Sequence, residues 1–210
     1  MRLIRAAAPF LPYAAIAAGL FGLHSAWAAL LGFHATLLAI LLVARPAIPF
    51  RLLLRSNSPR LLPGCALLCA SSGVLLYYSR PLLGLPETFS TDLAALGLTL
   101  SAWPKFIAYF ALVNPWLEEY FWRGYLNSPA EGLAPVDFFY AGYHVLVFYD
   151  RINLRASLIA LAGLLFIGWL WRRLSRESSG LLVSSISHMA ADLSILTAVY
   201  LNCMKGQAYG

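Results

Sequence analysis

The chain has 210 residues, of which 60% are hydrophobic and only 11% are charged, and its mean hydropathy is +0.72. A water-soluble globular domain carries roughly 25% charged residues, so this composition excludes an ordinary soluble fold and predicts a chain that lies in lipid. The net charge of +6 does not indicate a nucleic-acid partner, because the basic residues stand in short clusters between apolar runs, as they do in membrane proteins.

Apolar runs of membrane-spanning length follow one another along the chain. About 20 helical residues cross the hydrocarbon core, so a chain of this length suffices for about seven transmembrane helices and leaves no separate soluble domain. We therefore predict an all-α polytopic membrane helix bundle in which residues 1–210 form a single integral membrane domain. The expected spans are two helices within Ala6–Ala44 joined by a turn near Gly22–Ser25, then Leu61–Tyr78, Phe106–Leu126, Leu133–Tyr149, Leu154–Trp171 and Gly180–Leu201.

The segment 85–103 has a different pattern. Its apolar side chains recur at alternating spacings of four and three residues, which draws one stripe down a helix. The stripe consists of Phe89, Leu93, Leu96, Leu100 and Trp103. We predict one amphipathic helix at the membrane interface, and the pattern does not decide whether the segment also spans the bilayer.

The arginine clusters predict the orientation in the membrane. The N-terminal arginines, the loop Arg45–Arg60 and the loop Arg172–Arg176 all face the cytoplasm if seven spans begin with the N-terminus inside. Arg151 and Arg155 then lie outside, against the rule. The preference for arginine over lysine would suit a bacterial inner membrane.

Ionisable side chains interrupt the expected span Phe106–Leu126. Each costs about 2.5–3.5 kcal/mol at the centre of a membrane helix, so these groups must pair or face a wet protein interior. Glu119 and Arg123 are four residues apart in the order that favours a helical ion pair. Glu118 points about 140° away from Arg123 around the helix and is left free for chemistry.

Two later spans add histidines and an aspartate. His144 lies in the middle of its span, and His188 and Asp192 share one face of the last span. Together with Glu118 these side chains could activate a water molecule, the glutamate acting as general base and the other groups stabilising an oxyanion. The same groups could instead bind a divalent metal such as zinc, with Glu118, His144 and His188 as ligands, so the sequence leaves open whether any cofactor is required.

The remaining polar residues have ordinary explanations. His24 and His34 lie in the first two spans without a carboxylate partner, so we expect them to pack or to lie at the interface. Asn114–Pro115 is expected to kink the fourth span. Asp137 lies at the end of a span and is expected to be hydrated.

Three short motifs resemble those of one family. Glu118-Glu119-Tyr-Phe-Trp-Arg123 resembles the EExxxR motif of the CPBP family, the intramembrane peptidases that include CAAX prenyl protease 2 and bacteriocin-processing or abortive-infection relatives. Tyr140-Ala-Gly-Tyr-His144 resembles the FxxxH motif, with tyrosine in place of phenylalanine. His188-Met-Ala-Ala-Asp192 resembles the HxxxN or HxxxD motif. The motifs occur in the family order, and the resemblance covers a core of about residues 105–202.

The resemblance implies an intramembrane endopeptidase, of the glutamate or the metallo type, that cleaves a membrane-associated or lipidated protein. It implies that Glu118 and His144 activate water and that His188 and Asp192 stabilise the oxyanion. It further implies that Glu119 and Arg123 support the site.

Two functions of other classes stay open. The chain could be a non-catalytic immunity or scaffold protein of the same family, or a proton-coupled transporter, although no inverted repeat is visible in the sequence. The expected partners are the lipid bilayer and a peptide or protein substrate. The sequence does not indicate the oligomeric state or the physiological substrate.

Overall fold

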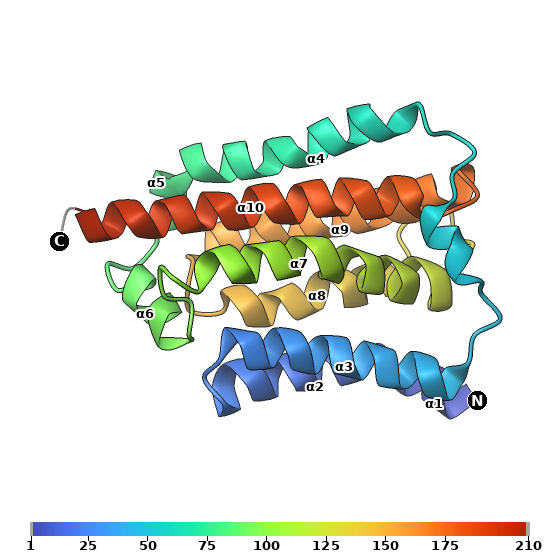
Figure 1. The fold of residues 1–210 in the computed structure, drawn as a ribbon, viewed down its shortest axis with the longest axis horizontal. Coiled ribbons are helices and arrows are strands. Elements are labelled where there is room, and N and C mark those ends of the chain that lie inside the picture. Colours follow the sequence, from blue (N-terminus) through green and yellow to red (C-terminus); the bar gives the residue numbers. More distant parts are fainter. Residues whose placement is uncertain (1, 209–210) are drawn as a thin grey trace.

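The computed structural model describes residues 2–208, and the side chains of residues 4–204. These residues form helices and loops, with no strand among them, which confirms the all-α prediction. The long helices lie alongside one another in one bundle, with α1 (Arg2–Ala7) at one end and the last turns of α10 (Leu182–Ala208) at the other (Figure 1).

Four helices are long and apolar enough to cross a membrane. They are α3 (Ala26–Ala44), α4 (Leu61–Tyr78), α9 (Leu154–Glu177) and the Leu182–Met204 part of α10, with mean hydropathies from 1.4 to 2.1. Much of their apolar surface faces outward, most of all on α4, where only 11% of the span is buried inside the protein. Such a surface is stable only in lipid, and the chain is an integral membrane protein.

Three further segments occupy positions of expected spans but are shorter or change their helical form. The helix α2 (Leu11–Ala17) continues into a π-helix, η1 (Ala18–Gly22), and α8 (Pro135–Phe148) has 14 residues. The helix α7 (Trp103–Glu118) runs directly into a second π-helix, η3 (Glu119–Tyr125). The count of seven transmembrane helices therefore stays a prediction. The short connecting elements are the 3₁₀-helix η2 (Phe50–Leu54), α5 (Arg80–Leu83) and α6 (Phe89–Ala95).

The turn expected near Gly22–Ser25 is confirmed. The Ser25 side chain accepts a hydrogen bond from the backbone N–H of Ala28 (3.2 Å), which caps the first turn of α3. Gly19 in η1 lies so close to α3 that a Cβ at this position would come within 2.3 Å of the Cα of Ala29. A glycine thus allows the two helices to pack backbone against backbone.

The single amphipathic helix predicted over 85–103 is wrong. The helix α6 ends at Ala95, and Gly97 adopts a left-handed conformation with φ of +86°. The N–H of Leu98 bonds to the carbonyl of Leu93 (3.0 Å) and the N–H of Gly97 to that of Ala94 (2.9 Å), which is a Schellman helix end. Phe89 and Leu93 of the apolar stripe therefore lie in α6 and Trp103 begins α7, whereas Leu96 and Leu100 lie in the turn between the two helices.

The helices α7, α8 and α10 carry the motif residues, and α3, α4 and α9 pack around them. The helices α4 and α10 approach each other closely at Gly73, where an added Cβ would lie 2.2 Å from the carbonyl oxygen of Ser194. In Figure 1, α4 lies on the outer side of α10, away from α7 and α8. The motif-bearing helices thus form the interior of the bundle.

Candidate active site

The side chains of the three motifs gather where α7 and η3 meet α8 and α10. Glu118 is the last residue of α7 and Glu119 the first of η3, and both are fully buried. His188 on α10 is equally buried, whereas His144 on α8 and Asp192 on α10 are partly exposed. Three helices thus bring acidic and imidazole groups together inside the bundle.

Glu119 and Arg123 form the expected ion pair. Nη1 of Arg123 lies 3.0 Å from Oε1 of Glu119, and neither side chain is more than 2% exposed. The Arg123 guanidinium also stacks over the ring of Tyr140 at 4.0 Å and donates to the carbonyl of Gly168 (3.4 Å). The guanidinium is held by contacts on its face and on its edge, so it fixes the position of the Glu119 carboxylate.

His188 lies between the two glutamates. Its Nδ1 is 3.0 Å from Oε1 of Glu119, and its Nε2 is 3.5 Å from Oδ1 of Asp192 and 4.0 Å from Oε2 of Glu118. The indole of Trp171 on α9 stacks on the imidazole, with ring centroids 4.2 Å apart. Both ring nitrogens thus face carboxylate oxygens, and the ring plane is held by stacking.

The carboxylate of Glu118 is held on one side only. Its Oε1 accepts a hydrogen bond from the hydroxyl of Tyr143 on α8, whereas its Oε2 has no hydrogen-bond partner among the described residues. A buried carboxylate oxygen without a donor is costly, so it is a strong candidate for contact with a reacting molecule. Tyr143 was not anticipated from the sequence, where only its position beside His144 marks it out.

His144 reaches this cluster indirectly. Its Nδ1 donates to the carbonyl of Tyr140 (3.0 Å), because a carbonyl oxygen can only accept, and its ring stacks on that of Tyr143 at 4.0 Å. The Tyr140 ring contacts both imidazoles, with ring centroids 5.3 Å from His144 and 6.2 Å from His188. The predicted site residues are therefore brought together, and His144 is connected to Glu118 through Tyr143.

The metal site that the sequence left open, with Glu118, His144 and His188 as ligands, does not fit this arrangement. Within the part of the chain that the structure describes, no three His, Cys, Asp or Glu side chains are arranged so that they could hold a metal ion.

Two residues that were not expected to take part in the site, Asn114 and His34, extend the cluster. Asn114 donates from Nδ2 to Oδ2 of Asp192 (3.2 Å), and its Oδ1 lies 3.1 Å from Nε2 of His34 on α3. His34 is buried, and neither of its partners, Tyr109 and Asn114, is a carboxylate, so the packing expectation holds, although Asn114 connects it to Asp192. Asn114 could have been found from its spacing of four residues from Glu118, which places both on one helix face. His34 gives no such signal.

The expectation that Asp137 is hydrated is also wrong. Asp137 is 2% exposed and forms a two-pronged ion pair with Arg172 of α9, through Nε to Oδ1 (2.9 Å) and Nη2 to Oδ2 (2.7 Å). Arg172 donates further hydrogen bonds to the carbonyls of Ser128, Ala130 and Gly132. The guanidinium thus fixes the loop between η3 and α8, and with it the start of the helix that carries His144.

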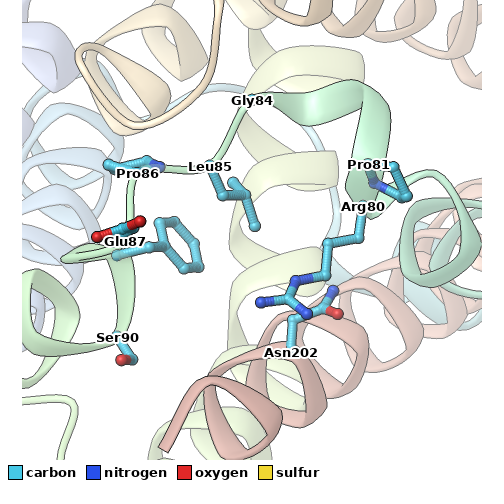
Figure 2. Close-up of a pocket in the computed structure, with 9 residues that line it drawn as sticks. Arg80, Pro81, Gly84, Leu85, Pro86, Glu87, Ser90 and Asn202 are labelled. Atoms are coloured by element: carbon cyan, nitrogen blue, oxygen red, sulfur yellow. The ribbon is translucent and has the colours of Figure 1, made fainter. Parts of the chain in front are cut away.

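An open pocket lies elsewhere, at the end of the bundle where α5 and α6 meet α10. It has a volume of about 350 Å³, and the side chains of Arg80 and Asn202 lie close together on one side of it (Figure 2). The other lining residues are Pro81, Gly84, Leu85, Pro86, Glu87, Phe89 and Ser90. No motif residue lines this pocket, so it is separate from the candidate active site.

The helical membrane fold and the buried acid–imidazole cluster define an integral membrane protein with a site suited to hydrolysis. Residues 100–194 match the family model described as type II CAAX prenyl endopeptidase, Rce1-like. Over these residues the chain is similar to this family of CAAX membrane proteases, and the matched segment contains all three motifs. No curated protein and no solved structure is similar enough to the chain to count as a match.

Proposed function

We propose that the chain is an intramembrane endopeptidase of the glutamate type that hydrolyses a peptide bond in a membrane-associated or lipidated protein. The observation that carries this proposal is the buried carboxylate of Glu118, whose Oε1 is held by Tyr143 while its Oε2 faces Nε2 of His188 across 4.0 Å. The similarity of residues 100–194 to a CAAX endopeptidase family supports the same reaction.

In the proposed reaction Glu118 is the general base. Its Oε2 accepts a proton from a water molecule, and the water oxygen attacks the carbonyl carbon of the peptide bond. The N–H of His188 stabilises the negative charge that develops on the carbonyl oxygen. Glu118 then returns the proton to the leaving amine as the C–N bond breaks, which yields one carboxylate and one amine product.

The neighbouring residues prepare these two groups. Glu119, fixed by Arg123, accepts from Nδ1 of His188 and sets the direction of the ring. Oδ1 of Asp192 lies 3.5 Å from Nε2 of His188 and keeps that side of the ring polar. His144 contributes its free Nε2, since its Nδ1 is engaged, and we assign it to orienting the attacking water.

The test compares the wild-type protein with Glu118→Gln, which keeps the size of the side chain but removes the base. Purified proteins would be incubated with prenylated CAAX peptides and with unmodified membrane peptides, and new N-termini would be identified by mass spectrometry. We expect cleavage by the wild type and a rate lower by roughly 10²- to 10⁴-fold for Glu118→Gln. Glu131→Gln, at an exposed loop position, is the matched control and should retain full activity.

Equal cleavage by wild type and Glu118→Gln would remove Glu118 from the mechanism. A cellular comparison of protein N-termini between the two forms would identify the natural substrates. It would also separate an enzyme from a non-catalytic immunity or scaffold protein, for which the two forms would give identical N-termini and the same phenotype.

The proposal includes a location. We infer a bacterial inner membrane with the N-terminus in the cytoplasm, because this orientation puts the most basic loops inside. Glu118 lies seven residues before the end of η3, and His188 lies six residues after the start of α10. Both are therefore about 10 Å from the same end of the bundle, which this orientation assigns to the cytoplasm.

A further inference from the structure

A chain of buried polar contacts leads from α3 into the candidate active site. The Tyr109 hydroxyl lies 3.1 Å from Nδ1 of His34, and Nε2 of His34 lies 3.1 Å from Oδ1 of Asn114. Nδ2 of Asn114 donates to Oδ2 of Asp192, whose other oxygen is 3.5 Å from Nε2 of His188. His34 and Asn114 are 3% and 2% exposed, so water does not compete for these contacts.

The donors and acceptors of this chain determine one another. A carboxylate oxygen only accepts, so the Asn114 atom that faces Asp192 is the amide nitrogen. The amide oxygen therefore faces His34 and can only accept, which requires a proton on Nε2 of His34. Nδ1 of His34 is then free to accept from the Tyr109 hydroxyl. Along this series of contacts from Tyr109 to Asp192, each donor therefore faces an acceptor.

We propose that His34 and Asn114 are positioning residues that hold the Asp192 carboxylate, and through it the imidazole of His188, in place beside Glu118. Neither residue contacts the groups assigned to the reaction, and both act through Asp192. His34 also lies on α3, outside the segment 100–194 that matches the family. The consequence for catalysis rests on the proposed function, whereas the hydrogen-bond chain does not.

The first experiment tests the chain of contacts without any substrate. The chain has four histidines, so the full-length protein labelled with ¹⁵N-histidine in detergent micelles gives a small set of ring signals. The His34 signals are those that disappear in His34→Gln. We expect a protonated Nε2 on His34 in the wild type and altered His34 shifts in Asn114→Leu, whereas His24→Asn, at an exposed turn, leaves them unchanged. An unprotonated Nε2 on His34 would overturn the proposal, and so would His34 chemical shifts that are the same in Asn114→Leu as in the wild type.

The second experiment exchanges the amide of Asn114 and the carboxylate of Asp192. Asn114→Asp places two carboxylates in contact, and we expect kcat to fall roughly 10- to 100-fold with little change in KM, because neither residue touches the substrate. The double variant Asn114→Asp/Asp192→Asn restores one amide and one carboxylate with their places exchanged, and residue 192 still offers an oxygen to His188. We expect most of the lost kcat to return. A double variant no better than Asn114→Asp would contradict the proposal.

A pair of substitutions at His34 separates positioning from packing. Glutamine can still donate to Oδ1 of Asn114, whereas leucine fills the space without a donor. We expect His34→Gln to keep most of kcat and His34→Leu to lose roughly tenfold or more, with thermal unfolding confirming that both proteins fold. Equal activity in the two variants would refute the assignment. If the wild type cleaves no peptide, the proposed function fails, and the NMR result alone decides on the hydrogen-bond chain.

Discussion

The hydroxyl of Tyr143 donates a hydrogen bond to Oε1 of Glu118, so the neighbour of the motif histidine contacts the proposed general base directly. His144 is stacked on the same tyrosine ring. Tyr143 therefore joins α8 to the end of α7 and connects the second motif to the first. The proposed mechanism needs this residue as much as it needs the histidine beside it.

Tyr143→Phe tests this contact. The substitution keeps the ring that stacks on His144 but leaves both oxygens of Glu118 without a donor. We expect a loss of about 1–3 kcal/mol in the free energy of unfolding and roughly a tenfold fall in kcat. Thermal unfolding in detergent and peptide cleavage would be measured in parallel. An unchanged melting temperature would show that the hydrogen bond contributes nothing to the folded state.

Tyr140 is expected to act through its ring and not through its hydroxyl. The ring lies 4.0 Å from the Arg123 guanidinium, and cation–π contacts of this kind contribute about 0.5–2 kcal/mol. Tyr140→Phe, the residue of the related family motif, should therefore have wild-type stability and activity. Tyr140→Leu should lose stability of that order. The two melting temperatures decide the matter, and a loss with phenylalanine would show that the hydroxyl carries the effect.

The Arg172–Asp137 pair is expected to be the most sensitive contact outside the site. Removing one partner of a buried pair costs about 3–5 kcal/mol, because the other charge stays buried alone. Arg172→Met should therefore lower the melting temperature strongly. The neighbouring pair Arg173–Glu177 is about half exposed and provides the matched control, since Arg173→Met should leave the melting temperature nearly unchanged. Similar losses in both variants would contradict a special role for Arg172.

Two glycines of α4 should respond in opposite ways to the same substitution. Gly73→Ala places a Cβ 2.2 Å from the Ser194 carbonyl oxygen, so α4 and α10 must separate at a cost of about 1–3 kcal/mol. Gly64 has open space around the same position, and alanine there should raise stability by about 0.5–1 kcal/mol. Thermal unfolding of both variants tests the packing of α4, and an equal response would show that α4 is not tightly packed.

Local patterns predicted much of this fold. The apolar run Leu61–Tyr78 matches α4 at both ends, because a lipid-facing helix needs little more than length and hydrophobicity. The Glu119–Arg123 pair followed from their spacing of four residues on one helix. The prediction over 85–103 failed because the stripe continues past Gly97, and periodicity does not register a left-handed residue that ends the helix.

The missed parts of the site depend on contacts between residues far apart in the sequence. Asp137 is buried because Arg172, 35 residues away, supplies its counter-charge, and nothing near Asp137 in the sequence indicates this. His34 meets Asn114 across 80 residues, through the packing of α3 against α7. A lone polar residue in an apolar run shows that a partner must exist but not which helix provides it.

The π-helix η3 allows the length of this span to change by one residue. Its backbone pairs each N–H with the carbonyl five residues earlier, as between Leu126 and Phe121 (2.9 Å), so it accommodates more chain in the same rise than an α-helix does. Deleting one residue within Glu119–Tyr125 would allow ordinary α-helical pairing and would leave the following chain in nearly the same direction, because a π-helical turn is an α-helical turn with one residue inserted. The loop that Arg172 holds could then keep its hydrogen bonds. The backbone should therefore tolerate the loss of one residue here better than in α8 or α10, where a deletion would rotate every later side chain by about 100°.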